Sequence, residues 1–165
     1  MEANPSQEFA LPESEGGAVL VRSARDEDLE AIVRCISAGS LWEGKEDPSN
    51  LAPYRAALAE AQHAPSDVLV AEADGEVVGV AQLIVFRHIQ MHGALSAELE
   101  TVHVRPDRRG LGIGGALVQT AIDRARALGC HRVQLTSNVE RPDAHRFWER
   151  MGFVPSHVGY KLPLV

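Results

Sequence analysis

The segment 104–118 joins a strand-like run to a helix-like run through four glycines, and it constrains the fold more than any other part of the chain. It reads Val-Arg-Pro-Asp-Arg-Arg-Gly-Leu-Gly-Ile-Gly-Gly-Ala-Leu-Val. Glycine lacks a Cβ atom and accepts positive φ, so the backbone of such a turn can approach a ligand closely. The first N–H groups of the following helix have no partner inside the helix, and the helix dipole favours negative charge there. The segment therefore predicts an anion site, with a phosphate or pyrophosphate as the expected ligand.

The spacing of these glycines argues against two widespread nucleotide-binding loops. A Walker loop ends in Gly-Lys-Ser/Thr, whereas Gly114-Gly115-Ala116 supplies neither the lysine nor the hydroxyl. A dinucleotide-binding loop reads Gly-x-Gly-x-x-Gly and is followed about 20 positions later by an acidic residue. The glycines here are spaced differently, and residues 128–132 contain no acid. Neither NTP hydrolysis nor dinucleotide binding is expected.

The loop matches a third pattern, Arg-x-x-Gly-x-Gly, in the residues Arg109-Gly110-Leu111-Gly112-Ile113-Gly114. With Arg105-Pro106 before it, this motif resembles the loop of the GCN5-related N-acetyltransferase (GNAT) superfamily, which wraps the pyrophosphate of acetyl-coenzyme A. The strand before the loop binds the pantetheine arm through its main chain in that superfamily. The resemblance thus implies acetyl-CoA as the acetyl donor, and a flexible glycine turn before an ordinary helix is the alternative. The residues implicated in donor binding are Val102, His103, Val104, Arg109, Gly110, Leu111, Gly112, Ile113, Gly114 and Gly115.

Charge is distributed unevenly around this loop. The net charge of -7 argues against general nucleic-acid binding. Residues 101–150 nevertheless hold 9 of the 16 Lys and Arg residues and only 5 of the 23 Asp and Glu residues. Some of these arginines suit solvated helix faces, but a polyanionic ligand explains Arg108 and Arg109 better.

Length and composition indicate one domain. A chain of 165 residues with 45% hydrophobic content suits a single compact core. Residues 1–17 carry prolines, glutamates and no periodicity, so we expect a mobile tail before a domain at 18–165. No apolar run approaches the roughly 20 residues of a membrane span, and the N-terminus does not read as a signal peptide. We therefore expect a cytoplasmic protein.

Apolar periodicity predicts an α+β domain with a mixed, mostly antiparallel sheet flanked by helices. Asp74-Gly75 between two β-rich runs predicts a hairpin. The order of elements is also that of the resembled superfamily. The expected strands lie at 18–22, 68–73, 77–86, 97–104 and 133–135, with a final strand or hairpin at 153–164. The expected helices are one ending at Gly39, one at 51–63, one after the loop ending at Gly129, and one from Pro142 ending at Gly152.

Two glutamates on the strand before the loop are candidates for a general base. Acetyl transfer requires an amine of pKa about 10.4 to lose a proton, which costs roughly 4 to 5 kcal/mol near pH 7. Glu98 and Glu100 share one strand face under period-two alternation, on the strand that borders donor and acceptor in the resembled superfamily. We favour Glu98 as the base and Glu100 as orienting or structural, although either could face solvent. A backbone N–H near Val102 would stabilise the oxyanion.

Residues 144–153 depart from a second pattern of the superfamily. Many members protonate the departing CoA thiolate with the Tyr of Ala-x-x-Phe-Tyr-x-x-x-Gly-Phe, and Trp148 stands at that position here. Indole cannot donate a proton at useful pH. Either CoA leaves as a thiolate that water protonates, or His145 or Tyr160 is the acid. Trp148 itself either lies at the donor site or packs on a helix face. The superfamily's Asn-x-x-Ala also changes, because Arg141 stands three positions before Ala144.

The segment 135–147 and Ser156-His157 resemble the aminoalkylphosphonate N-acetyltransferase branch of the superfamily. This resemblance implies a small amine substrate, anionic ones included, with Ser137, Asn138 and His145 lining the site or ordering its loop. Asn138 equally suits a turn. The loop between the first two helices covers the acceptor site in the resembled fold. Its residues Trp42 and Glu43 are therefore candidates for substrate binding, although Trp42 equally suits a loop anchor.

Other constellations are weaker. His88 and His92 lie where i, i+4 spacing does not align side chains, so no metal is expected. Ser137, Asp143 and His145 lack the Gly-x-Ser-x-Gly elbow of a hydrolase. We expect an N-acetyltransferase that transfers the acetyl group directly to a small primary amine. We expect no nucleic-acid or membrane partner, and the sequence is compatible with a homodimer. The alternatives are a non-catalytic acyl-CoA-sensing or interaction module and a protein lysine or N-terminal acetyltransferase.

Overall fold

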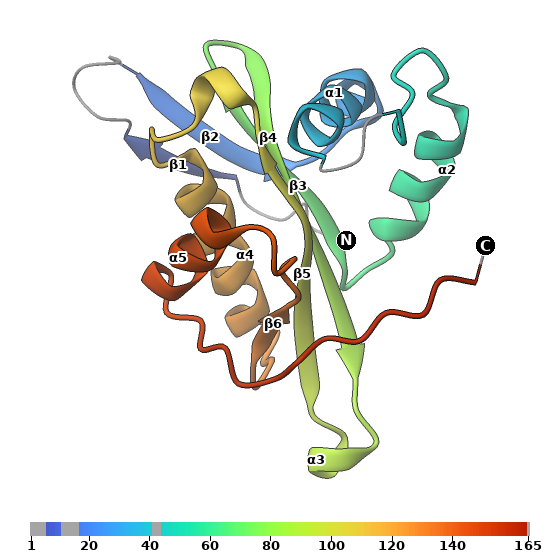
Figure 1. The fold of residues 1–165 in the computed structure, drawn as a ribbon, viewed down its shortest axis with the longest axis vertical. Helices are drawn as coiled ribbons and strands as arrows, with labels where there is room; N and C mark the ends of the chain where they lie inside the picture. The colour runs from blue at the N-terminus through green and yellow to red at the C-terminus, as the bar shows by residue number, and fades with distance from the viewer. Residues whose placement is uncertain (1–5, 11–16, 41–43, 165) are drawn as a thin grey trace.

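The computed structural model describes residues 6–10, 17–40 and 44–164. Within them, one six-stranded sheet runs in the order β1-β2-β3-β4-β5-β6 (Figure 1). The pairs from β1 to β5 are antiparallel, whereas β5 and β6 run parallel. The predicted α+β fold with a mixed, mostly antiparallel sheet is confirmed. The strands are β1 (Gln7–Ala10), β2 (Ala18–Ser23), β3 (Asp67–Ala73), β4 (Glu76–Arg87), β5 (Leu95–Val104) and β6 (Val133–Leu135).

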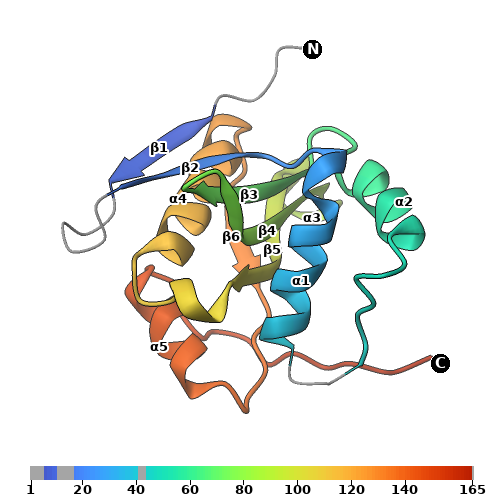
Figure 2. The same ribbon diagram turned by 90° about the horizontal axis from the view of Figure 1, so that it is seen from above.

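Helices cover both faces of this sheet (Figure 2). Helix α1 (Leu29–Gly39) and helix α2 (Ala52–Ala61) lie on one face, and the side chains beneath them form the smaller of two apolar cores. Helix α4 (Ile113–Ala127) and helix α5 (Pro142–Arg150) lie on the other face over the larger core. A short helical turn, α3 (Gln90–Gly93), closes the long β4–β5 hairpin. No helix in the described ranges is both long and apolar enough to cross a bilayer.

Local turn chemistry behaves as the sequence predicts. Asp74 and Gly75 have φ of 55° and 77°, and these two positive values are what a primed two-residue hairpin turn requires. Gly129 and Gly152, which follow α4 and α5, have φ of 76° and 90°. Because a glycine in the left-handed region readily ends a helix, these two residues fix where both helices stop.

The N-terminal segment differs from its prediction. Residues 7–10 were expected to belong to a mobile tail, but Gln7–Ala10 forms β1 and pairs with β2. Phe9 packs against the larger core, and the Thr120 hydroxyl of α4 donates to Gln7 Oε1 at 3.0 Å. These contacts hold a strand of 4 residues, which is too short to be recognised from its pattern.

The C-terminal segment also differs from its prediction. Residues 154–164 form neither a strand nor a hairpin, and all of them are exposed. In Figure 1 this segment runs away from β6 toward the C-terminus. Pro155 and Pro163 lack N–H donors, and β6 offers an edge of only 3 residues, so a continuous strand pair cannot form.

Candidate active site

The glycine loop is built around two left-handed residues. Gly110 and Gly112 have φ of 82° and 86°, values that residues with a side chain rarely adopt. Helix α4 begins at Ile113, and its first hydrogen bond runs from the Ala116 N–H to the Gly112 carbonyl at 3.0 Å. The N–H groups before Ala116 therefore lie at the open end of a helix of 15 residues. This geometry suits an anion.

The two arginines before the loop are not equivalent. Arg108 Nη2 lies 3.3 Å from Asp74 Oδ2, so part of its charge is met within the chain. Arg109 instead donates from Nε to the Val104 carbonyl at 3.1 Å and remains exposed. Within the described residues Arg109 makes no ion pair. Of the two residues that the sequence assigned to a polyanionic ligand, Arg109 is thus the better placed.

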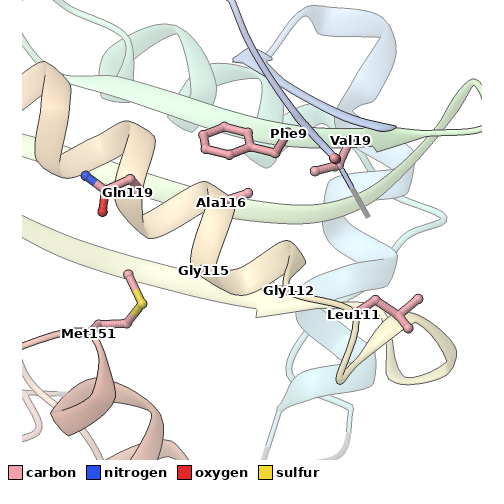
Figure 3. Close-up of a pocket in the computed structure, with 9 residues that line it drawn as sticks. Phe9, Val19, Leu111, Gly112, Gly115, Ala116, Gln119 and Met151 are labelled. Atoms are coloured by element: carbon pink, nitrogen blue, oxygen red, sulfur yellow. The ribbon is translucent and has the colours of Figure 1, made fainter. Parts of the chain in front are cut away.

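A cavity of about 280 Å³ adjoins the loop (Figure 3). Phe9 of β1 and Met151 after α5 lie on either side of the first turns of α4 in this view. The cavity wall also includes Leu111 and Gly112 of the loop. Sequence reasoning missed this cavity, because one wall comes from β1, which it had placed in the mobile tail.

Strand β5 has an open edge beside the loop. On one side it pairs with β4, and on the other it pairs with β6 only at Ala97–Leu99. The strand continues to Val104, so within the described residues its last part has no strand partner on the β6 side. Main-chain groups of Val102, His103 and Val104, which the resemblance assigns to the pantetheine arm, lie in this part of β5.

A β-bulge at Thr101 reverses the alternation of side chains along β5. Thr101 has φ of 54°, and the β4–β5 register shifts between Val80 and Gln82, opposite this part of β5. An extra residue in one strand sends the following side chains to the opposite faces. The side chains that contact the larger core therefore change from odd to even positions: they are those of Ala97, Leu99, Val102 and Val104.

The other face of β5 carries three titratable side chains, those of Glu98, Glu100 and His103. The bulge is what places His103 on the same face as the two glutamates. Glu98 Oε2 accepts a hydrogen bond of 3.1 Å from Gln134 Nε2 on β6. Burial and the negative charge of Glu98 raise the pKa of the Glu100 carboxyl above its usual range, against a smaller opposing effect of Lys161. Glu100 is therefore a stronger base than an ordinary glutamate.

His103 packs against the last residue of helix α1. A Cβ atom on Gly39 would collide with His103 Nδ1, so a larger residue would require the imidazole to shift. Burial lowers the pKa of His103, and the positive charges of Arg141 and Arg109 lower it further, while Glu46 opposes them. The imidazole is thus held neutral at ordinary pH. The sequence had marked Gly39 only as the end of a helix.

Arg141 bridges the two sides of the site. It precedes α5, and its Nη2 donates to the Gly39 carbonyl at 2.5 Å, although 102 positions separate the two residues. Sequence reasoning did not assign Arg141 to the site. Its one signal was the departure from the superfamily's asparagine three positions before Ala144.

Comparison with known proteins agrees with this geometry. The sequence profile of the acetyltransferase (GNAT) family matches residues 21–153, which is most of the chain. The chain belongs to the GNAT family. The resemblance drawn from the glycine loop is confirmed, and the chain is a member of this acetyltransferase family.

Relatives of this GNAT chain include enzymes named for small amines. Aminoalkylphosphonate N-acetyltransferase of Salmonella typhimurium is 38% identical over 84 residues, and the match spans 51% of this chain and 54% of that enzyme. Aminoglycoside N(6′)-acetyltransferase type 1 of Stenotrophomonas maltophilia is 33% identical over 129 residues, 75% of this chain and 81% of that enzyme. Among solved structures, a transcriptional regulator from Bacillus halodurans C-125 has a TM-score of 0.80 and 35% identity, with 88% of this chain and 99% of that chain covered.

The aromatic residues that the sequence analysis singled out in this GNAT protein lie in different surroundings. The Trp148 ring packs edge-on against Phe147 and Phe153, with ring centroids 4.8 Å and 5.6 Å away. These contacts agree with a packing role. Tyr160 is 92% exposed and far from being enclosed in a site. Trp42 and Glu43 lie outside the described residues.

The loop before α5 is ordered by its own hydrogen bonds. His145 Nε2 donates to the Asn138 carbonyl at 2.8 Å. Asn138 Oδ1 accepts from the Glu140 N–H at 2.9 Å, which is the geometry of an Asx turn. Asn138 and His145 thus order this loop of the GNAT domain. Ser137 beside them is half-buried.

The histidines that sequence analysis weighed as metal ligands lie at the far end of the β4–β5 hairpin. His88 Nε2 is 2.9 Å from Ser96 Oγ and 3.2 Å from Arg132 Nη2, whereas His92 is exposed in turn α3. In the described part of the chain, no three His, Cys, Asp or Glu side chains come together as metal ligands would.

Proposed function

We propose that this GNAT enzyme transfers the acetyl group of acetyl-CoA to the primary amine of a small molecule by direct attack in a ternary complex. Strand β5 carries the proposal, because one strand leads into the glycine loop, has an open edge, and presents Glu98, Glu100 and His103 on one face. Relatives named for aminoalkylphosphonates and aminoglycosides support a small acceptor.

The loop and its surroundings would hold the donor. Backbone N–H groups of residues 110–115 and the start of α4 suit the pyrophosphate, and Arg109 adds a whole positive charge. The open edge of β5 suits the amide-rich pantetheine arm, and the cavity between Phe9 and Met151 suits the nucleotide end. When bound, acetyl-CoA supplies the activated acetyl group.

We assign the general base to Glu100 rather than to Glu98, which the sequence had favoured. The raised pKa of Glu100 makes its carboxylate a better proton acceptor than that of an ordinary glutamate. Glu98 already accepts a hydrogen bond from Gln134 and adds its negative charge to the surroundings of Glu100. Glu98 thus serves as a positioning residue that strengthens the base.

The remaining two steps need little from side chains. A main-chain N–H near Val102, at the bulge, is a fixed dipole that can stabilise negative charge on the reacting oxygen without reorganising. We assign protonation of the departing thiolate to water, because the Nε2 proton of His145 is engaged with Asn138 and Tyr160 is exposed. A thiol of pKa about 8.5 is an adequate leaving group at neutral pH.

The test is turnover with a panel of small amines. Release of free CoA from acetyl-CoA should depend on both the enzyme and the amine, and mass spectrometry should find the acetylated amine. Titration calorimetry should show that acetyl-CoA binds without any amine present. An enzyme that binds acetyl-CoA but releases no CoA with any amine would contradict the transfer reaction and support a sensing module.

A further inference from the structure

Arg141 is a half-buried cation at the mouth of the site. Its Nη2 is engaged with the Gly39 carbonyl, and within the described residues it makes no ion pair with an acidic side chain. A guanidinium has five N–H donors in a rigid, planar arrangement. Most of the donors of Arg141 therefore have no partner among the described residues, and the position of the group is fixed by its bond to Gly39 at the end of α1.

The surroundings of Arg141 favour an anion. Arg141 and Arg109 both place positive charge near His103, whose imidazole is half-buried and held neutral. Glu46 is the acidic side chain that acts on the same imidazole in the opposite direction. Arginine commonly binds phosphonate, phosphate and carboxylate groups through two parallel hydrogen bonds, and burial strengthens such bonds.

The position of His103 limits the size of the ligand. His103, which lies against Gly39, the residue that Arg141 contacts, is three positions from Glu100 on the same face of β5. Because of the bulge at Thr101, His103 and Glu100 pair with Val80 and Gln82 of β4, which are only two positions apart, so the span along the strand is roughly 7 Å. A short acceptor, with one hydrogen bond to Glu100 and another to Arg141, suits a site of this size.

We propose that Arg141 is a specificity-determining residue that binds the oxyanion group of the acceptor, so that the acceptor is a short primary amine carrying a phosphonate, phosphate or carboxylate. This inference rests on the proposed function and adds the chemical class of the acceptor. Arg141 contacts the end of α1 on the Glu100 side of the sheet, whereas the CoA phosphates are assigned to the start of α4. We therefore assign the anion that Arg141 binds to the acceptor, and the affinity for acetyl-CoA of an Arg141 variant tests this assignment.

The experiment compares acceptors that differ in their charge. 2-Aminoethylphosphonate and β-alanine carry an anion, and propylamine is a neutral match in size. For the unaltered enzyme, kcat/KM should be higher for the anionic amines. Arg141→Gln should lower kcat/KM for them by about 10- to 100-fold, mostly through KM, and change propylamine little. Arg141→Lys should restore part of the loss, and the affinity for acetyl-CoA should stay the same.

The control is Arg146→Gln, which removes an exposed arginine of α5 that pairs with Asp143. It should leave kcat/KM unchanged for both the anionic and the neutral amines. An equal loss of kcat/KM for charged and neutral amines in Arg141→Gln would overturn the inference. It would show that Arg141 only holds the end of α1 against the start of α5. Weakened acetyl-CoA binding would reassign Arg141 to the donor.

Binding without turnover separates this inference from the proposed function. Methylphosphonate should bind the unaltered enzyme in titration calorimetry and bind Arg141→Gln at least 10-fold more weakly. If no amine is acetylated but methylphosphonate binding depends on Arg141, the transfer reaction fails and the anion site stands. If turnover is found but methylphosphonate binds both proteins equally, the anion site fails alone.

Discussion

At the scale of single residues, Gly39 shapes the site by lacking a side chain. Its role is to leave room for His103, since a Cβ atom would meet the imidazole. We expect Gly39→Ala to destabilise the protein by about 1 to 3 kcal/mol, because a well-packed region must shift to admit the methyl group. Urea unfolding measures this, and Gly159→Ala is the matched control, since its Cβ would make an ordinary contact of 3.6 Å with Thr136 Cγ2. Equal stability of the two variants would mean that His103 rotates away at no cost.

Glu100 predicts a pH dependence of the rate. Burial and the charge of Glu98 raise its pKa, so the carboxyl gains a proton at higher pH than an ordinary glutamate would. Because only the ionised form accepts a proton, kcat/KM should fall as the pH drops through this raised pKa. Glu100→Gln should lower kcat/KM about 100-fold or more and abolish that acidic limb, as a pH profile would measure. Glu98→Gln should keep the acidic limb of the pH profile but move it to lower pH. If Glu98→Gln alone abolishes this limb, Glu98 is the base.

At the scale of elements, a buried ion pair joins α4 to the sheet. Arg124 of α4 pairs with Asp67 at the start of β3, and the Ser23 hydroxyl donates to Asp67 Oδ2 at 2.6 Å. Both charged side chains are at least nine-tenths buried. Asp67→Asn should lower the free energy of unfolding by about 3 to 5 kcal/mol, because it removes a carboxylate charge that faces a buried guanidinium. Arg126→Gln, which breaks an exposed pair with Asp123 on the same helix, should cost under about 1 kcal/mol in the same denaturation assay. A similar small cost for Asp67→Asn would mean that water reaches Arg124.

The elements differ in how readable they were from the sequence. The strand, loop and helix around residues 104–118 could be predicted because glycine spacing and apolar periodicity are local signals. The bulge at Thr101 could not, since no glycine marks it. The contact between Arg141 and Gly39 joins residues 102 positions apart, and only the fold brings them together. As a result the strand, loop and helix around residues 104–118 were predicted almost completely, whereas the contacts of Arg141 and His103 emerged from tertiary packing.

At the scale of the whole molecule, the C-terminal segment is the least integrated part of the described chain. We expected a strand or hairpin here, yet Leu162 and Leu164 are 84% and 87% exposed. Changing both to Ser should leave the melting temperature of dilute protein unchanged, because exposed side chains contribute little to folding. Calorimetry over a concentration series measures this. A fall of several degrees would show that the segment is covered in solution, and sedimentation of the two proteins would then reveal whether a second copy covers it.

The bulge at Thr101 determines which face of the sheet each following side chain of β5 occupies. Deleting one residue there would keep the strand's length almost unchanged, but it would exchange the faces of the residues that follow: a valine would join Glu98 and Glu100 on their face and His103 would turn into the core. A substitution in this stretch alters one side chain. A single deletion would change which side chains lie on each face of β5 while the fold stays the same. Diversification of such a domain is therefore expected to proceed by exchanging residues along β5 and not by changing its count.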